Sequence, residues 1–130
     1  MTSLSINFAE KSLTGVGSHQ VRIARSARRD LIDILEWTAK EFGELAALRY
    51  DALLKQALRD ISEVPERPGS MQRAFLKGSR TYHISLSRQK TTGVRVKDPR
   101  HFLLYRFDGR VVEILRILHD ARDLARLATT

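Results

Sequence analysis

The feature that most constrains this fold is a pair of apolar runs near the C-terminus, separated by Asp108-Gly109. The runs, residues 101–107 and 111–118, are rich in β-branched and aromatic side chains, which favour strands. Asp-Gly suits a two-residue hairpin loop, because both central residues need a positive φ and these two tolerate it best. The sequence therefore predicts an antiparallel hairpin with charged residues set into its strands and at its exit.

Two helices are predicted upstream of the hairpin. The first opens at Ser26, whose hydroxyl suits an N-cap, and ends at Gly43. The second starts at about residue 44, and Pro65 forbids its continuation. Because the connection is so short, the two helices should be antiparallel neighbours. Helical spacing predicts the apolar faces, formed by Leu31, Ile34, Leu35, Thr38 and Phe42 in the first helix and by Leu48, Leu54, Ala57, Leu58 and Ile61 in the second.

Further strands are predicted on both sides of the helices. A short one covers residues 21–23, and Tyr82, Ile84 and Leu86 alternate with polar residues as in a half-buried strand. The outward positions of that strand are His83, Ser85 and Ser87. The basic stretch 88–99 is expected to be an exposed loop.

The order of these elements predicts an α+β fold of two layers for one domain, residues 21–130. An antiparallel helical hairpin packs on a small, mainly antiparallel sheet, and a short helix at 123–127 ends the chain. Residues 1–20 show no sustained period and are expected to form a flexible leader.

Aromatic residues are expected to contribute to the core. Trp37 and Phe42 should be buried on the first helix, and Tyr82 and Tyr105 should pack with them, their hydroxyls directed outward.

Charge is distributed unevenly along the chain. Residues 25–66 hold 7 Lys and Arg against 9 Asp and Glu, whereas residues 67–110 hold 11 against 2. Such a positive field attracts nucleic acid or an acidic protein surface. The alternative is a merely soluble basic surface.

Composition excludes several classes of site. The chain has no cysteine, so disulfides, thiolate nucleophiles and cysteine-based zinc sites are ruled out. The histidines and acids show no metal-ligand spacing, so neither a metal nor a cofactor is expected. No apolar run reaches the ~20 residues that span a bilayer, and no secretory signal is recognisable. We therefore expect a cytoplasmic protein.

The C-terminal residues carry a family resemblance. With the Arg80-Thr81-Tyr82 strand and Tyr105-Arg106, the element order resembles the ParE/RelE toxin superfamily of bacterial toxin–antitoxin systems. The run Ile-Leu-Arg-Ile-Leu-His at residues 114–119, followed by Arg122-Asp123, is similar to the ParE branch in particular.

The resemblance implies a growth-inhibiting toxin that is neutralised by a protein antitoxin. ParE relatives poison DNA gyrase, and this reading needs no catalytic residue; Arg116, His119, Arg122 and Asp123 would then serve toxicity. A ParD-like antitoxin would wrap a groove of the toxin with an acidic, amphipathic C-terminal segment, giving a hetero-oligomer. One sequence does not reveal which residues line that groove.

RelE relatives, in contrast, cut messenger RNA on the ribosome, and this is the alternative function. Here His83 or His119 would act as base, and Arg116 or Arg122 would be the phosphate cation. However, the dense basic cluster of those relatives is missing, and Phe102 stands where they carry arginine. A third possibility is a homologue that binds antitoxin without being toxic.

Two of these residues also have structural interpretations. His119, at the end of a buried strand, would more often be a structural hydrogen-bonding residue than a catalyst. Arg116 either points to solvent or is held by a carboxylate, with Glu113 and Asp120 nearby in sequence.

Overall fold

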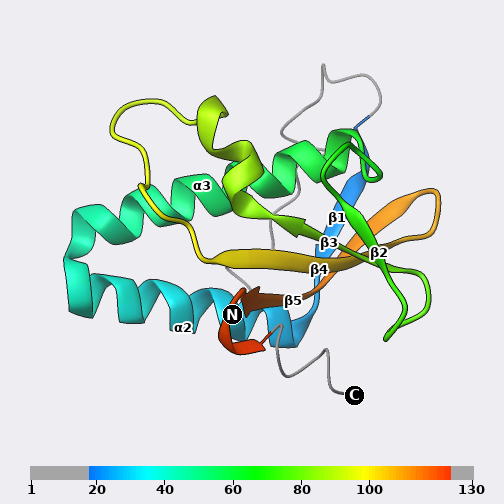
Figure 1. The fold of residues 1–130 in the computed structure, drawn as a ribbon, viewed down its shortest axis with the longest axis horizontal. Coiled ribbons are helices and arrows are strands. Elements are labelled where there is room, and N and C mark those ends of the chain that lie inside the picture. The colour runs from blue at the N-terminus through cyan, green and yellow to red at the C-terminus, as the bar shows by residue number, and fades with distance from the viewer. Residues whose placement is uncertain (1–17, 124–130) are drawn as a thin grey trace.

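The computed structural model describes residues 18–123, which form one two-layer α+β unit (Figure 1). The elements are β1 (Gln20–Ile23), α2 (Arg25–Phe42), α3 (Glu44–Glu63), β2 (Met71–Arg73), β3 (Ser79–His83), the 3₁₀-helix η1 (Ile84–Lys90), β4 (His101–Phe107) and β5 (Val111–His119). The sheet order is β1-β5-β4-β3-β2, with β1 parallel to β5 and the other pairs antiparallel. The predicted fold class is confirmed. The expected terminal helix, residues 123–127, lies outside the described residues apart from Asp123. The expected leader, residues 1–20, also lies outside them except for residues 18–20, where the His19 amide donates a 2.8 Å hydrogen bond to the Ser62 carbonyl and Gln20 begins β1.

The helical hairpin is held by backbone features at its turn. Gly43, with φ of 97°, ends α2 as predicted, and α3 ends before Pro65. The predicted N-cap is wrong: α2 starts at Arg25, and the Ser26 hydroxyl instead donates a hydrogen bond of 3.0 Å to the Leu115 carbonyl. That bond attaches the start of α2 to β5.

The main core lies between the helices and the sheet. Leu54, Ala57, Leu58 and Ile61 of α3 are buried there as predicted.

The predicted burial at the hairpin turn is wrong. Trp37 is 57 % exposed, Phe42 is 68 % exposed and Leu48 is 64 % exposed. The turn between α2 and α3 extends past the ends of the strands (Figure 1), so within residues 18–123 the sheet does not cover these side chains.

Strand β3 is shorter than the alternating pattern suggested. It ends at His83, because the His83 ring accepts a 3.2 Å hydrogen bond from the Ser85 amide and thereby starts η1. The Tyr82 and Tyr105 hydroxyls are buried, not directed outward; they bond Ser87 and the Pro65 carbonyl. No pattern in the sequence predicted β2, which has three residues.

The predicted hairpin is confirmed, but its turn differs. Of Asp108 and Gly109, only Gly109 has a positive φ, of 97°. The Asp108 carboxylate accepts 2.8 Å hydrogen bonds from the amides of Arg110 and Val111. Both hydrogen bonds lower the pKa of Asp108, and the bond from the Val111 amide has the larger effect. The loop therefore closes around the Asp108 side chain instead of forming the expected two-residue turn.

Candidate functional site

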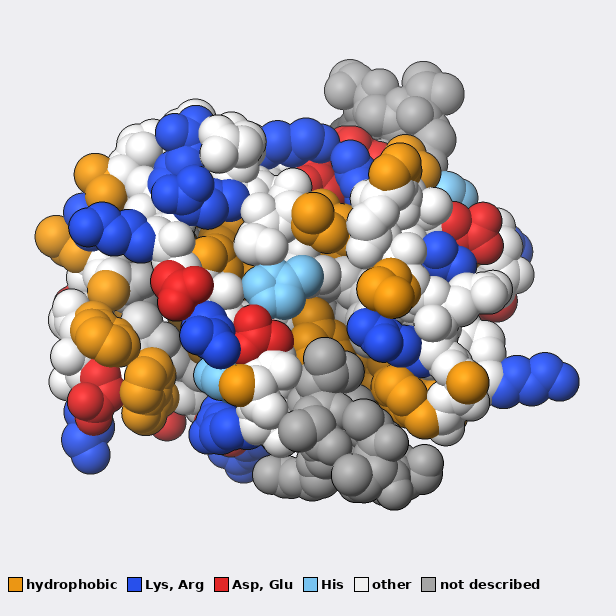
Figure 2. All heavy atoms as spheres, in the orientation of Figure 1, with side chains coloured by type: hydrophobic (Ala, Val, Ile, Leu, Met, Phe, Trp, Pro, Cys, Tyr) orange, Lys and Arg blue, Asp and Glu red, His pale blue; other side chains and the backbone are white. Residues whose placement is uncertain are grey.

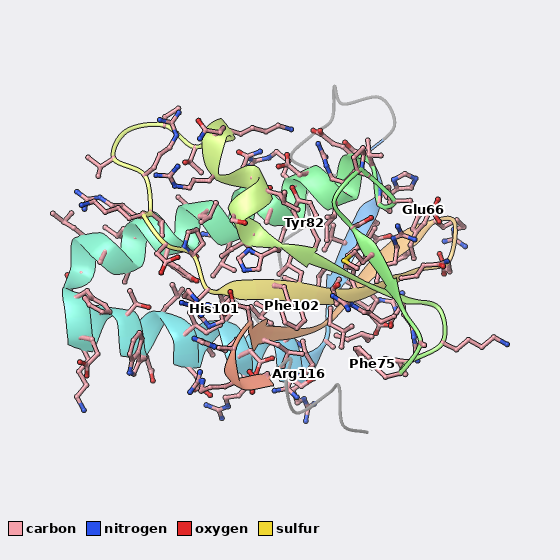
Figure 3. All side chains as sticks on the ribbon, viewed as in Figure 1. Glu66, Phe75, Tyr82, His101, Phe102 and Arg116 are labelled. Carbon is pink, nitrogen blue, oxygen red and sulfur yellow. The ribbon has the colours of Figure 1, made fainter. Side chains whose placement is uncertain are left out.

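The sheet face that points away from the helices carries an apolar cluster. Phe102 and Leu104 of β4 pack with Leu118 of β5, and all three are buried. Phe75 and Leu76, from the connection between β2 and β3, pack against this cluster. Figure 3 labels Phe75 and Phe102. Phe102, which stands where the RelE relatives carry arginine, thus belongs to a second, smaller hydrophobic cluster.

Arg116 is held by a carboxylate from a distant part of the chain. Its guanidinium donates to both oxygens of Asp30 on α2, at 2.7 and 3.0 Å, and Asp30 also accepts a 2.9 Å hydrogen bond from the Ile117 amide. The hydrogen bond to Asp30 raises the pKa of Arg116. The partner is neither Glu113 nor Asp120, the two acids nearest in sequence. Arg116 therefore links α2 to β5.

His119 organises the turn that follows β5. Its Nδ1 accepts hydrogen bonds from the amides of Ala121 and Arg122, at 3.1 and 3.2 Å, while its own amide donates to Asp123 at 2.8 Å. Three of the four predicted toxicity residues, His119, Arg122 and Asp123, thus meet in one turn. These contacts agree with a structural role for His119.

A second histidine reaches the same turn from β3. Because the His83 Nδ1 accepts the Ser85 amide, its Nε2 carries the proton and donates to Asp120 at 2.9 Å. Asp120 also accepts a 3.0 Å hydrogen bond from Arg100. Burial opposes ionisation of Asp120, but hydrogen bonds from His83 and Arg100 outweigh it and lower its pKa. Sequence reasoning named His83 and Asp120 but did not place them together.

A buried tyrosine–histidine pair supports this turn from inside and was not foreseen. The Tyr50 hydroxyl accepts from the Arg100 amide at 3.0 Å and donates to Nδ1 of His101 at 2.6 Å. Burial lowers the pKa of His101 to about 4 and raises that of Tyr50 to about 12. The His119 ring stands edge-on to His101 at a centroid distance of 5.3 Å.

We call the polar side chains around the end of β5 the exit corner; they are Asp30, His83, Arg100, His101, Arg116, His119, Asp120 and Asp123. Within residues 18–123, no group of three or more His, Cys, Asp and Glu could hold a metal ion. In the same part of the chain, no helix is long and apolar enough to cross a membrane.

Comparison with known proteins identifies relatives of this fold. Residues 21–124 match the family model of the ParE toxin of the type II toxin–antitoxin system parDE. No curated protein matches the sequence. Among solved structures, the chromosomal ParDE system of P. aeruginosa superposes with a TM-score of 0.60 at 18 % identity, covering 79 % of this chain and 97 % of that one. The RelBE2 toxin–antitoxin complex of Mycobacterium tuberculosis gives a TM-score of 0.47 at 28 % identity, with coverages of 78 % and 98 %. The family match extends over most of the described residues, and the chain belongs to the ParE toxin family of type II toxin–antitoxin systems.

Proposed function

We propose that this protein inhibits growth by binding DNA gyrase in the cytoplasm, and that a ParD-like antitoxin neutralises it. The observation that carries the proposal is the hydrophobic cluster on the outer face of the sheet, which occupies the position where the ribonuclease relatives carry arginine. Metal-free RNA cleavage needs a base, an acid and cations around the reacting phosphate. Phe102, Leu104 and Leu118 cannot supply any of these.

The candidate ribonuclease residues are also occupied by contacts within the chain. Arg116 forms its double hydrogen bond with Asp30, and Nδ1 of His119 accepts two backbone amides. These contacts restrain the Arg116 guanidinium and occupy the His119 nitrogen that would otherwise accept a proton. This arrangement favours a toxin that acts by binding.

The test is to induce this protein alone in bacterial cells and to follow thymidine and methionine incorporation over the first minutes. Gyrase binding predicts an early fall in DNA synthesis while protein synthesis continues. Purified protein should then inhibit supercoiling by gyrase. Harmless induction would instead indicate a non-toxic homologue that binds only the antitoxin.

A matched pair of variants locates the surface that binds the target. Arg122→Ala should reduce toxicity, because Arg122 lies in the turn ordered by His119, whereas Arg110→Ala in the β4–β5 loop should leave it unchanged. Both arginines are exposed, so neither change should unfold the protein. If the two variants were equally toxic, the turn that contains Arg122 would not be part of the surface that binds the target.

One observation favours the alternative function, a ribosome-dependent ribonuclease. The His83 ring is oriented by Asp120, and its Nδ1 lies 2.8 Å from the Ser85 hydroxyl, an arrangement that suits a general base. Cleaved transcripts and an early fall in methionine incorporation, both abolished by His83→Ala, would establish that reading in place of gyrase binding.

A further inference from the structure

One row of residues crosses all five strands on the face of the sheet that points away from the helices. Strand pairing places five residues, one from each strand, opposite one another; in sheet order they are Arg22, Glu113, Arg106, Ser79 and Arg73. Arg106 shares its face with Phe102 and Leu104, because alternate residues of a strand point to the same side. The row therefore borders the outer hydrophobic cluster. We call its three cations, Arg22, Arg73 and Arg106, the arginine row.

The three cations are regularly spaced. They stand on alternate strands of the sheet, β1, β4 and β2, and neighbouring strands lie about 4.8 Å apart. Their Cα atoms are therefore about 10 Å apart, and the row spans about 19 Å. Arg73 and Arg106 lie close to the β2–β3 and β4–β5 connections, at the right of Figure 1, and Lys and Arg side chains are prominent at this end of the space-filling view (Figure 2). The row thus presents positive charge along a line.

Two of these arginines have no acidic partner. Among residues 18–123, no carboxylate lies within ion-pair distance of Arg73 or Arg106. Arg73 donates a 2.8 Å hydrogen bond to the Thr81 hydroxyl, and the Arg106 side chain makes no hydrogen bond in that part of the chain. Ser79, which stands between the two arginines, is 1 % exposed, and its hydroxyl has no hydrogen-bond partner there. Both guanidinium groups therefore lack a negative charge to bind.

The third arginine faces the single acid of the row. Arg22 lies 4.0 Å from Glu113, at the limit of an ion pair, and the two side chains are 63 and 34 % exposed. Such an exposed pair contributes little free energy, so a ligand of higher charge can replace the carboxylate. With three arginines against one glutamate, the row keeps a positive excess.

The chemistry of the row indicates a phosphate backbone as its ligand. A guanidinium group binds a phosphate through two parallel hydrogen bonds, and a nucleic acid presents its phosphates at regular spacing. Residues 67–110, which include Arg73 and Arg106, hold 11 Lys and Arg against 2 Asp and Glu. Such a field attracts a polyanion to this part of the surface.

The surroundings of the row favour a duplex over a single strand. Proteins that bind single strands stack the bases on exposed aromatic rings. Among residues 18–123, the large exposed aromatic side chains are Trp37 and Phe42, near the α2–α3 turn, whereas Phe102, on the face of the row, is 4 % exposed. Arginines about 10 Å apart can instead reach phosphates on both sides of one groove of B-DNA, because its grooves are about 6 and 12 Å wide. Binding of this kind needs no contact with a base.

We propose that the arginine row binds the phosphate backbone of duplex DNA. The inference rests on the proposed function, because gyrase holds duplex DNA, and contact with that DNA adds to the attachment of the toxin to its target. The row crosses β5 near its start, whereas the exit corner surrounds its end. Substitutions can therefore change the two surfaces separately.

The first test measures binding of the purified full chain to a short fluorescent DNA duplex at several salt concentrations. Each phosphate contact steepens the dependence of log affinity on log salt by about 0.9. Arg106→Gln should therefore weaken binding and make the slope shallower by about 0.9. The control Arg29→Gln makes the same change of net charge at an exposed position of α2 and should alter neither quantity. Equal weakening by both variants would show a response to net charge alone and would overturn the proposal.

A variant of opposite sign tests the same row. Glu113→Gln removes the acid beside Arg22, so it should tighten binding to the duplex, whereas Glu36→Gln on α2 makes the same change of net charge and should not. Urea unfolding of each variant shows that its fold is retained. Unchanged affinity of Glu113→Gln would mean that DNA does not approach the row.

Other polyanions decide which ligand the row takes. The unaltered protein should bind the duplex more tightly than single-stranded RNA of the same length, and unlabelled duplex should compete better than a poly-glutamate peptide of equal charge. Tighter binding of RNA, equal competition by the peptide, or no binding of the duplex at low salt would each overturn the proposal.

These measurements contain no gyrase, so they are independent of the proposed function. If the duplex were bound through the arginine row but supercoiling by gyrase were not inhibited, only the proposed gyrase binding would fail. If supercoiling were inhibited while the duplex was not bound, only the present inference would fail. Where both hold, Arg106→Gln should also weaken the inhibition of supercoiling, and Arg29→Gln should not.

Discussion

The exit corner differs from the open groove between α3 and the loop after η1 in how its polar and apolar groups are partnered. We call this second region the α3 groove; its lining includes Leu45, Leu48, Arg49 and Val94. In the exit corner, Arg116 is paired with Asp30, and Asp120 bonds both His83 and Arg100. In the groove, leucine side chains are exposed, and Arg49 and Lys97 have no acidic partner among the described residues. Paired groups hold a fixed shape, whereas exposed apolar side chains beside cations without ion-pair partners form a surface that a partner of opposite charge can cover.

This difference predicts opposite mutational behaviour. Substitutions in the exit corner should cost stability, because they leave donors or acceptors without partners. Substitutions in the groove should leave stability nearly unchanged and alter binding.

The largest effect is expected at Asp30. Asp30→Ala removes both hydrogen bonds to Arg116 and leaves the Ile117 amide without its acceptor, so the free energy of unfolding should fall by about 3 kcal/mol. Urea unfolding measures it. The control is Asp33→Ala, an exposed acid on the same helix, which should change stability by about 0.5 kcal/mol or less. If Asp30→Ala and Asp33→Ala changed the free energy of unfolding equally, the Asp30–Arg116 pair would not stabilise the fold.

Acid should weaken the same region through His101. The pKa of His101 is about 4 in the folded chain and about 6.5 when unfolded, so between these values the unfolded state binds more protons and stability falls as pH falls. Lowering the pH from 7 to 4.5 should therefore cost about 2.5 kcal/mol through this residue. The depressed pKa values of Asp108 and Asp120 act only below about 3.8, outside that window.

The variant His101→Gln isolates this contribution. Glutamine can accept the Tyr50 hydroxyl hydrogen bond but does not titrate, so the loss of stability between pH 7 and 4.5 should be smaller in the variant by about 2.5 kcal/mol. Urea unfolding at the two pH values measures it. An unchanged pH dependence would show that His101 is not the group responsible.

A smaller effect is expected at His119. His119→Ala leaves the amides of Ala121 and Arg122 without their acceptor and should cost about 1 kcal/mol, as the loss of a helix cap does. His119→Asn retains a side-chain acceptor and should recover part of it. Unfolding and growth inhibition are measured together. Loss of toxicity at unchanged stability would instead indicate that the imidazole contacts the target.

The elements that the sequence predicted correctly have local signals. Helical spacing, Gly43 and Pro65 placed the two helices, and two apolar runs placed β4 and β5. Features that depend on contacts between distant parts of the chain were not predicted. The three residues of β2 form a strand only because β3 lies beside them, and the Asp30 that holds Arg116 is 86 residues away in sequence.

In the candidate site too, contacts between residues close in sequence were predictable and contacts between distant residues were not. His119, Arg122 and Asp123 are close in sequence and do share one turn. The Tyr50–His101 pair joins residues 51 apart and had no sequence signal. Hydrophobic spacing also cannot separate a core face from a partner-binding face, since both are apolar stripes on a helix. Phe42 and Leu48 were therefore predicted to be buried and are exposed.

The smallest effect is expected at Trp37, near the turn between α2 and α3. Trp37→Ser should lower the free energy of unfolding by about 0.5 kcal/mol or less, since the ring is 57 % exposed and meets the Phe42 ring edge-on at 5.6 Å. A tryptophan in the core would cost about 3 to 5 kcal/mol when truncated, so urea unfolding separates the two cases. A loss of that larger size would place the turn in the core and leave the neighbouring groove as part of the folded interior. A small loss keeps the turn as surface, and the exposed leucines beside it then remain available to a partner.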